Sequence, residues 1–345
     1  MNKKLLITLS VVFAAFVGGF IVYENMGNAA KTHYVNPVFE PVLADPTVVR
    51  ADDGYFYAYG TEDAWGEKVE SKLIPIVRST NLIDWEYVGE AFKKKPDWKP
   101  AGGLWAPDIS RFNGKYYLYY SFSLWGDPDP GIGVATSEKP EGPFQDHGKL
   151  FLSSEIGVNN SIDPQLFVTD DGTPYLFWGS FHGIYGVQLS KDGFSTVGKK
   201  FQIAGDTYEG AFLFKKNGHF YFFGSRGSCC EGADSTYHVA VGRSDSLKGP
   251  YVDKNGVKLT EYGGTDVLKA REDGKFVGPG HITVVTDDAG QDWMLYHAID
   301  KKDPLLWNGA TRRPLMLDRI IWKDGWPLIR GKSPSETKQE GPVIR

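Results

Sequence analysis

The segment DPQLFVTDDGTPYLF, residues 163–177, decides the fold because it holds two short strands and the turn between them. The runs QLFV and PYLF supply the apolar and aromatic side chains that strands favour, and the Asp-Gly pair between them is a strong hairpin signal. A carboxylate, Asp163, stands at the start. The segment therefore predicts an antiparallel β-hairpin that is led by an acidic residue.

The same pattern of leading polar residue, apolar strand, turn and aromatic strand occurs five times. The five segments are residues 45–59, 108–120, 163–177, 209–223 and 281–296. Each is followed by a second predicted strand pair, over residues 75–89, 132–148, 184–198, 238–253 and 312–329. Two hairpins form a four-stranded antiparallel sheet, so the repeat predicts an all-β chain folded as a five-bladed β-propeller. A β-sandwich of similar strand content would not explain the fivefold recurrence.

Composition agrees with many short strands and tight turns. The 345 residues include 41 Gly, 20 Pro, 10 Trp, 18 Tyr and 21 Phe, and the aromatic side chains are expected to fill the core between blades. A net charge of −5 does not indicate a nucleic-acid-binding protein, because such proteins usually carry a basic surface. Two cysteines are too few for a disulfide scaffold and match no zinc spacing.

The N-terminus predicts export. Lys3 and Lys4 precede an uncharged apolar stretch and then a run of small residues, which is the pattern of a secretory signal over residues 1–30. The apolar stretch is long enough for an uncleaved membrane anchor to be the second interpretation. We expect a single propeller domain over residues 34–330 and a C-terminal tail over residues 331–345.

The leading residues of the five segments are Asp45, Asp108, Asp163, Glu209 and His281. The innermost strands of a propeller run along one channel, so these side chains are expected to converge at its mouth. Carboxylates brought together have shifted pKa values, which gives an acid and a base at neutral pH. Two such groups can hydrolyse a glycosidic bond, and the alternative use of the cluster is a divalent metal site.

The motifs that carry these residues resemble family 43 of the glycoside hydrolases, which are five-bladed propellers acting on arabinans and xylans. The matching motifs are ADPTVV (44–49), LWAPDI (104–109), NSIDPQLF (160–167), YEGAF (208–212) and GPGH (278–281). The resemblance implies that Asp45 is the general base, Glu209 the general acid and Asp163 the modulator of the acid's pKa. It also implies inversion at the anomeric carbon.

The resemblance implies further contacts to an oligo- or polysaccharide substrate. These are Trp105 as a stacking surface, Asn160, and an arginine at Arg313, although Arg312 stands beside it. His281 resembles a channel histidine that lies next to an ion, usually calcium, and contacts it largely through water. No cofactor is expected for the chemistry itself, and a monomer is expected.

Within the family, the segment GSCCEGADSTYHVAVGRSDSLKGPYVDKNG (227–256) resembles endo-arabinanases. Two departures leave endo and exo action open: Ala44 stands where those enzymes have His, and Glu209 is followed by Gly-Ala. For Cys229 and Cys230 we expect two small, unbridged buried residues in a loop that borders the cleft, because adjacent Cα atoms lie about 3.8 Å apart, below the usual disulfide range. A strained bridge between them in an oxidising compartment is the alternative.

Three other functions are consistent with a propeller of this kind. A β-xylosidase acting on xylo-oligosaccharides is the nearest, although such relatives usually carry a further β-sandwich domain. A non-catalytic carbohydrate-binding propeller would not need the acid. A retaining fructan- or sucrose-cleaving enzyme would need sequence motifs that are absent here.

Overall fold

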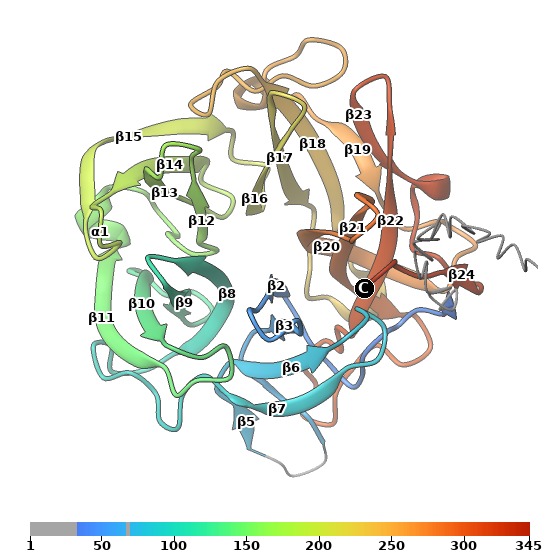
Figure 1. The fold of residues 1–345 in the computed structure, drawn as a ribbon, viewed down its shortest axis with the longest axis horizontal. Coiled ribbons are helices and arrows are strands. Elements are labelled where there is room, and N and C mark those ends of the chain that lie inside the picture. The colour runs from blue at the N-terminus through green and yellow to red at the C-terminus, as the bar shows by residue number, and fades with distance from the viewer. Residues whose placement is uncertain (1–32, 67–69) are drawn as a thin grey trace, which may run out of the picture.

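The computed structural model describes residues 33–66 and 70–345, which form five four-stranded antiparallel sheets arranged around a central axis (Figure 1). The predicted five-bladed propeller is confirmed. The predicted signal or anchor, residues 1–30, lies outside the described residues. Within the part of the chain that is described, no helix is both long and apolar enough to cross a membrane.

Each blade is a meander in which every strand pairs with the next strand of that blade along the chain. In all five blades the first of the four strands lies at the channel. Blade 1 contains β2 (Thr47–Arg50), β3 (Phe56–Tyr59), β6 (Pro75–Ser79) and β7 (Glu86–Glu90). Blade 2 contains β8 (Gly103–Phe112), β9 (Lys115–Ser123), β10 (Gly131–Ser137) and β11 (Gln145–Leu152). Blade 3 contains β12 (Gln165–Val168), β13 (Pro174–Trp178), β14 (Ile184–Leu189) and β15 (Thr196–Ala204). Their inner strands β2, β8 and β12 all face the centre of Figure 1.

The last two blades complete the ring. Blade 4 contains β16 (Glu209–Lys216), β17 (His219–Arg226), β18 (His238–Ser244) and β19 (Thr265–Leu268). Blade 5 contains β20 (Phe276–Thr286), β21 (Asp292–Asp300), β22 (Leu315–Lys323) and β23 (Trp326–Ile329). The fourth strand of blade 4 lies beyond the predicted segment 238–253, because the chain around Val252 forms only isolated bridges before it enters the sheet.

Small elements lie outside the blades. They are β1 (His33–Tyr34), β4 (Asp63–Ala64), β5 (Ser71–Lys72), β24 (Gln339–Glu340), α1 (Ser153–Ile156), η1 (Gly232–Asp234), η2 (Leu259–Glu261) and η3 (Arg330–Lys332). β1 pairs antiparallel with β24, which ties the start of the described chain to its C-terminal segment. β4 pairs with β5 beside blade 1.

Turn chemistry and aromatic packing explain the blades. Asn113-Gly114 and Asn217-Gly218 each join two strands with positive φ at both residues, as a type I′ hairpin requires. The buried apolar side chains form five clusters, one between each pair of neighbouring blades. Tyr and Phe side chains occur in all five clusters, as predicted from composition.

A backbone feature is repeated in the inner part of every blade. One residue has a positive φ: Asp45, Ala106, Asp163, Gly210 and His281 in blades 1 to 5. Asp45 and Asp163 lie two residues before β2 and β12, whereas the other three lie inside their strands, where the pairing register shifts. In four blades the N–H of this residue donates to a side chain on, or just after, the second strand of the preceding blade. These acceptors are Thr61, Ser121, Ser225 and His297, for the N–H groups of Ala106, Asp163, His281 and Asp45. The repeat thus joins each blade to the next and fixes where the leading side chains lie.

A second ring of hydrogen bonds lies two residues further along the inner strands. Thr47, Asp108 and Gln165 occupy this position in blades 1 to 3, and each accepts the N–H of a residue in the next blade. Asp108 accepts the N–H of Leu166 at 2.9 Å, and burial raises the pKa of this carboxyl to about 7. Asp108 is therefore a link between blades 2 and 3.

Replacing Asp108 tests this link. Asp108→Ala is expected to lower the free energy of unfolding by about 1–3 kcal/mol, because the buried Leu166 N–H loses its acceptor. Asp108→Asn keeps an acceptor oxygen and is expected to lose less. Denaturant unfolding of both variants measures the difference, and equal losses would contradict the assigned hydrogen bond.

Candidate active site

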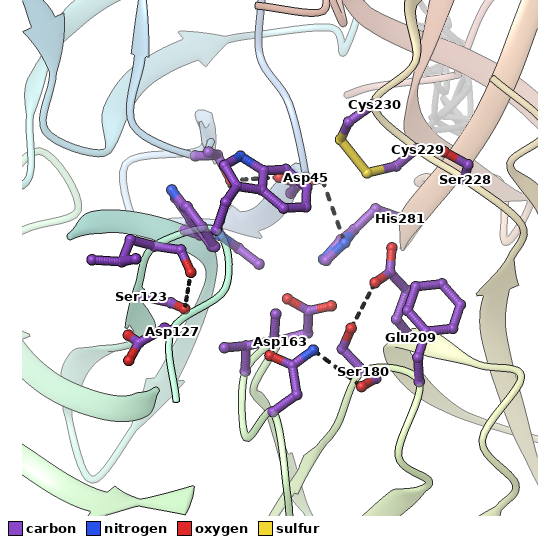
Figure 2. A pocket seen from close by; sticks show the side chains of 18 of the residues that line it. Asp45, Ser123, Asp127, Asp163, Ser180, Glu209, Ser228, Cys229, Cys230 and His281 are labelled. Atoms are coloured by element: carbon purple, nitrogen blue, oxygen red, sulfur yellow. Dashed lines mark hydrogen bonds and ion pairs between the residues drawn. A yellow bond between two sulfur atoms is a disulfide. The ribbon is translucent and has the colours of Figure 1, made fainter. Parts of the chain in front are cut away.

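A cavity of about 1190 Å³ lies at the end of the channel where the inner strands begin. Its wall includes four of the five predicted leading residues: Asp45, Asp163, Glu209 and His281. Figure 2 shows these four side chains around one hollow. The cavity exceeds the roughly 300–1,000 Å³ of a typical small-molecule pocket, so it has room for more than one sugar ring.

Asp108 does not belong to this group, and its predicted convergence is wrong. It does not line the cavity, because it stands two residues beyond the positive-φ position that Asp45 and Asp163 occupy. In blade 2 that position is Ala106, which has no functional side chain. In blade 4 it is Gly210, so Glu209 reaches the cavity from one residue earlier.

The Asp45 carboxylate is held by contacts from blades 1 and 5. Arg313 Nη1 donates to Oδ1 at 2.8 Å, and Thr61 Oγ1 donates to Oδ2 at 2.5 Å. His281 Nδ1 lies 3.5 Å from Oδ1. Burial by itself would raise the pKa of Asp45, but Arg313, His281 and His297 together outweigh it and hold this pKa well below its usual value. Asp45 is therefore ionised at neutral pH.

The pKa values of Asp163 and Glu209 are shifted upward, in the opposite direction from that of Asp45. Burial, followed by the neighbouring charges of Glu209 and Asp45, raises the pKa of Asp163 well above its usual value. Burial is also the main cause that raises the pKa of Glu209, against the Ser180 hydroxyl, which donates to Oε2 at 2.8 Å. A proton is thus retained in this pair at a pH at which Asp45 has lost its own.

Asp163 also controls the backbone next to Glu209. In blade 3 the second-strand position that carries Thr61 or Ser225 in other blades is Gly179, which has no side chain to accept an N–H. Asp163 Oδ2 instead accepts the N–H of Gly210, at 3.1 Å. Asp163 therefore sets the position of the residue that follows Glu209.

The predicted substrate contacts Trp105, Asn160 and Arg313 all line the cavity. Trp105 lies next to Trp125, with ring centroids 5.7 Å apart, and Trp125 is 77% exposed. Asn160 Nδ2 donates to the Ser180 carbonyl at 3.1 Å.

The structure distinguishes the two adjacent arginines. Arg313 points to Asp45, whereas Arg312 donates to Glu40 and Asp303 away from the cavity. Arg313 Nε is buried and has no hydrogen-bond partner among the described residues.

The metal prediction for His281 has limited support from the donor set. Within residues 33–66 and 70–345, no group of three or more His, Cys, Asp or Glu side chains is arranged to hold a metal ion. Both oxygens of the neighbouring Asp45 are engaged by Arg313 and Thr61. The residues do not form a direct calcium cage, and a water-mediated calcium at His281 stays a prediction.

Several site residues escaped the sequence analysis. Thr61 and Ser180 lie two residues after β3 and β13, and His297 lies within β21. His297 is fully buried, and its Nδ1 accepts the Asp45 N–H at 3.1 Å. Burial also raises the pKa of Asp63, which lines the cavity, to about 6. The pattern of an aromatic residue, Gly and a hydroxyl residue in YGT (59–61) and WGS (178–180) is a sequence signal for Thr61 and Ser180, whereas no local pattern marks His297.

The prediction that Cys229 and Cys230 are unbridged and buried is wrong. Their Sγ atoms are bonded to each other, and both residues are partly exposed. Cα atoms 3.8 Å apart are close for a disulfide, but the side chains turn toward the same side of the loop. The loop does border the cavity, as expected.

The cavity combines Asp45, whose pKa is lowered, with the carboxyl pair Asp163 and Glu209, whose pKa values are raised. This is the arrangement that general base and general acid catalysis needs at neutral pH. Aromatic surface beside the carboxylates suits a ligand with apolar C–H faces and hydroxyl groups.

Comparisons with known proteins agree with this chemistry. The model of Glycosyl hydrolases family 43 matches residues 34–327. The extracellular endo-α-(1→5)-L-arabinanase 1 of Bacillus subtilis (strain 168) is 34% identical over 83% of this chain and 87% of that protein. The extracellular exo-α-(1→5)-L-arabinofuranosidase ArbA of Cellvibrio japonicus is 31% identical over 84% of this chain and 86% of its own. The α-L-arabinanase of Cellvibrio cellulosa in complex with arabinohexaose has a TM-score of 0.74 and 29% identity, over 84% of this chain and 96% of that one.

Proposed function

Because the chain belongs to family 43 of the glycosyl hydrolases, we propose that it hydrolyses the α-L-arabinofuranosidic bonds of arabinan with inversion of configuration. The observation that carries the proposal is the opposite shift of two pKa values in one cavity, downward for Asp45 and upward for Glu209. Relatives that act on arabinan support the choice of substrate.

Asp45 is the proposed general base. Its Oδ1 and Oδ2 each accept one hydrogen bond, from Arg313 and Thr61, which orient the carboxylate and leave lone pairs for a water molecule. The low pKa keeps it ionised, so it can take a proton as the water attacks the anomeric carbon. The electron pair of the broken C–O bond goes to the leaving oxygen.

Glu209 is the proposed general acid. Its raised pKa keeps the proton that the leaving oxygen needs, and Ser180 fixes the orientation of its carboxyl group. The like charges of Asp163 and Glu209 disfavour ionisation of both carboxyls together, and Asp163 also positions the adjacent Gly210 N–H. Two steps of proton transfer thus occur on opposite sides of one sugar, as inversion requires.

Four cavity residues are proposed to bind the sugar. Arg313 lines the cavity beside Asp45 and is proposed to donate a guanidinium N–H to a sugar hydroxyl. Trp105 and the more exposed Trp125 offer ring faces to the C–H side of a furanose. Asn160 stands three residues before Asp163 and lines the same cavity.

A panel of four substrates tests the proposal. Linear debranched arabinan, arabinoxylan, an aryl α-L-arabinofuranoside and an aryl β-xyloside are incubated with the protein, and released reducing sugar or aryl group is measured. The expected result is hydrolysis of arabinan. Faster cleavage of the xyloside would favour the β-xylosidase alternative, and no release from any substrate would favour a binding propeller. Product sizes from arabinan distinguish endo from exo action.

The basic limb of the pH profile tests the pair Asp163 and Glu209. Glu209 must be protonated to act, so kcat/KM falls as pH rises through its raised pKa. Asp163→Asn removes the like-charge repulsion between the two carboxyls, and the limb is therefore expected to move to lower pH. Ser180→Ala removes a donor that stabilises the charged form, and the limb is expected to move to higher pH. Shifts of the same sign in both variants would contradict the assignment.

We further propose that the protein is exported and that residues 34–330 act as one catalytic domain. The two curated relatives named above are described as extracellular, which supports export. Fractionation of cells and N-terminal sequencing of the secreted form test this, and full-length protein in the membrane fraction would favour the anchor.

A further inference from the structure

The Cys229–Cys230 disulfide occupies a place in the cavity that the proposed mechanism does not use. It lies in the loop between β17 and β18 and lines the cavity wall. These are the two cysteines of the whole chain, so any thiol chemistry of the protein reports on this bond alone.

The loop that carries the disulfide is held in place at both ends. The Ser228 carbonyl accepts the N–H groups of Thr236 and Tyr237, at 3.1 and 3.0 Å. Further along, the Gly232 N–H donates to Thr311 Oγ1, at 3.2 Å, which links this loop to blade 5. The disulfide is therefore a fixed part of the wall.

The chemistry of the bond suits one face of a sugar. A disulfide has no N–H or O–H donor, and its two sulfurs with their CH₂ groups form a small, polarizable, apolar surface. Trp105 in β8 and Trp125 in the loop between β9 and β10 also line the cavity, so aromatic surface borders the same space.

The disulfide lies on the side of the acid. Glu209 begins β16, and the disulfide follows β17, so both belong to blade 4. Figure 2 shows Cys229 and Cys230 on the side of Glu209 and His281, with Ser123 and Asp127 on the other side of the hollow. A general acid faces the leaving oxygen, so sugar residues on its side belong to the leaving group.

We propose that the Cys229–Cys230 disulfide forms an apolar wall of the subsite that binds the leaving-group arabinose units. This inference rests on the proposed hydrolysis of arabinan and adds to it a determinant of substrate length. Reduction opens the bond to two thiols that rotate independently, so the wall loses its shape.

The test compares oxidised and reduced protein on two substrates. Labelling with a thiol reagent is expected to find no reactive thiol before treatment with a phosphine reductant and two after it. On linear arabino-oligosaccharides, reduction is expected to raise KM about fivefold with kcat unchanged, as for the loss of roughly 40 Å² of apolar contact. On an aryl arabinofuranoside, which has no leaving-group sugar, KM is expected to stay the same.

The Cys229→Ser/Cys230→Ser double variant is the matched control. It is expected to show the raised KM without reductant and no response to reductant, with the thermal midpoint checked for both forms. An unchanged KM for oligosaccharides, an equal rise for the aryl substrate, or reactive thiols in the untreated protein would overturn the proposal while leaving arabinan hydrolysis intact. No hydrolysis of arabinan by the oxidised protein would overturn the proposed function and this subsite with it.

Discussion

The Glu209→Gln variant is expected to hydrolyse arabinan about 10²–10⁴ times more slowly than the unchanged protein, the usual contribution of a general acid. The amide cannot donate a proton to the leaving sugar oxygen. A dinitrophenyl arabinofuranoside releases a stable anion and needs no such proton, so its hydrolysis is expected to fall far less. Steady-state kcat/KM on the two substrates measures the difference.

The fold of this variant is expected to be intact, because Gln keeps an oxygen that accepts the Ser180 hydroxyl. An unchanged thermal midpoint is the control. Arabinan hydrolysis at the original rate would contradict the role of Glu209 as the acid. A loss of equal size on both substrates would point to a structural effect of the substitution.

The Asp45→Asn variant is expected to lose about 10²–10⁴-fold in kcat on every substrate, whatever its leaving group. The amide cannot take a proton from the attacking water, and this step is common to all substrates. Asn keeps an oxygen that accepts from Arg313, and the Thr61 hydroxyl can rotate to accept from the amide nitrogen. The site geometry is therefore expected to survive.

The contrast between these two variants separates the roles. Rates for a series of aryl arabinofuranosides with leaving groups of different pKa are measured for each. A strong dependence on leaving group for Asp45→Asn, with none for Glu209→Gln, would mean that the two roles are reversed.

Much of the fold could be predicted from the sequence because its signals are local. Asn113-Gly114 and Asn217-Gly218 select type I′ hairpins within a few residues, and the aromatic strands around them pack between blades. The fourth strand of blade 4 could not be placed, since its position depends on a loop that runs around Val252 before it pairs.

The candidate site could be predicted only in part, because the exact position of a residue along its inner strand decides whether its side chain faces the cavity. An aspartate near the start of an inner strand faces the cavity at the positive-φ position but links two blades two residues later, as Asp45 and Asp108 do. No local signal separates these cases. His297 and Arg313 lie 252 and 268 residues from Asp45 in the chain, and only the closed ring brings them to it.

One hydrogen bond of Asp163 depends on a single residue of the repeat, Gly179. Gly179 interrupts the ring of side-chain acceptors, and Asp163 replaces it by accepting the Gly210 N–H. A glycine at that one position therefore lets a carboxylate hold the backbone beside the proposed acid.

The central claim is a single displacement in which Asp45 activates water and Glu209 protonates the leaving oxygen. Proton NMR of the first sugar released from an α-linked arabino-oligosaccharide tests it most directly, when spectra are recorded before the anomers equilibrate. The account predicts that the β-anomer appears first and the α-anomer follows by mutarotation. Initial release of the α-anomer would show retention of configuration and would contradict the account.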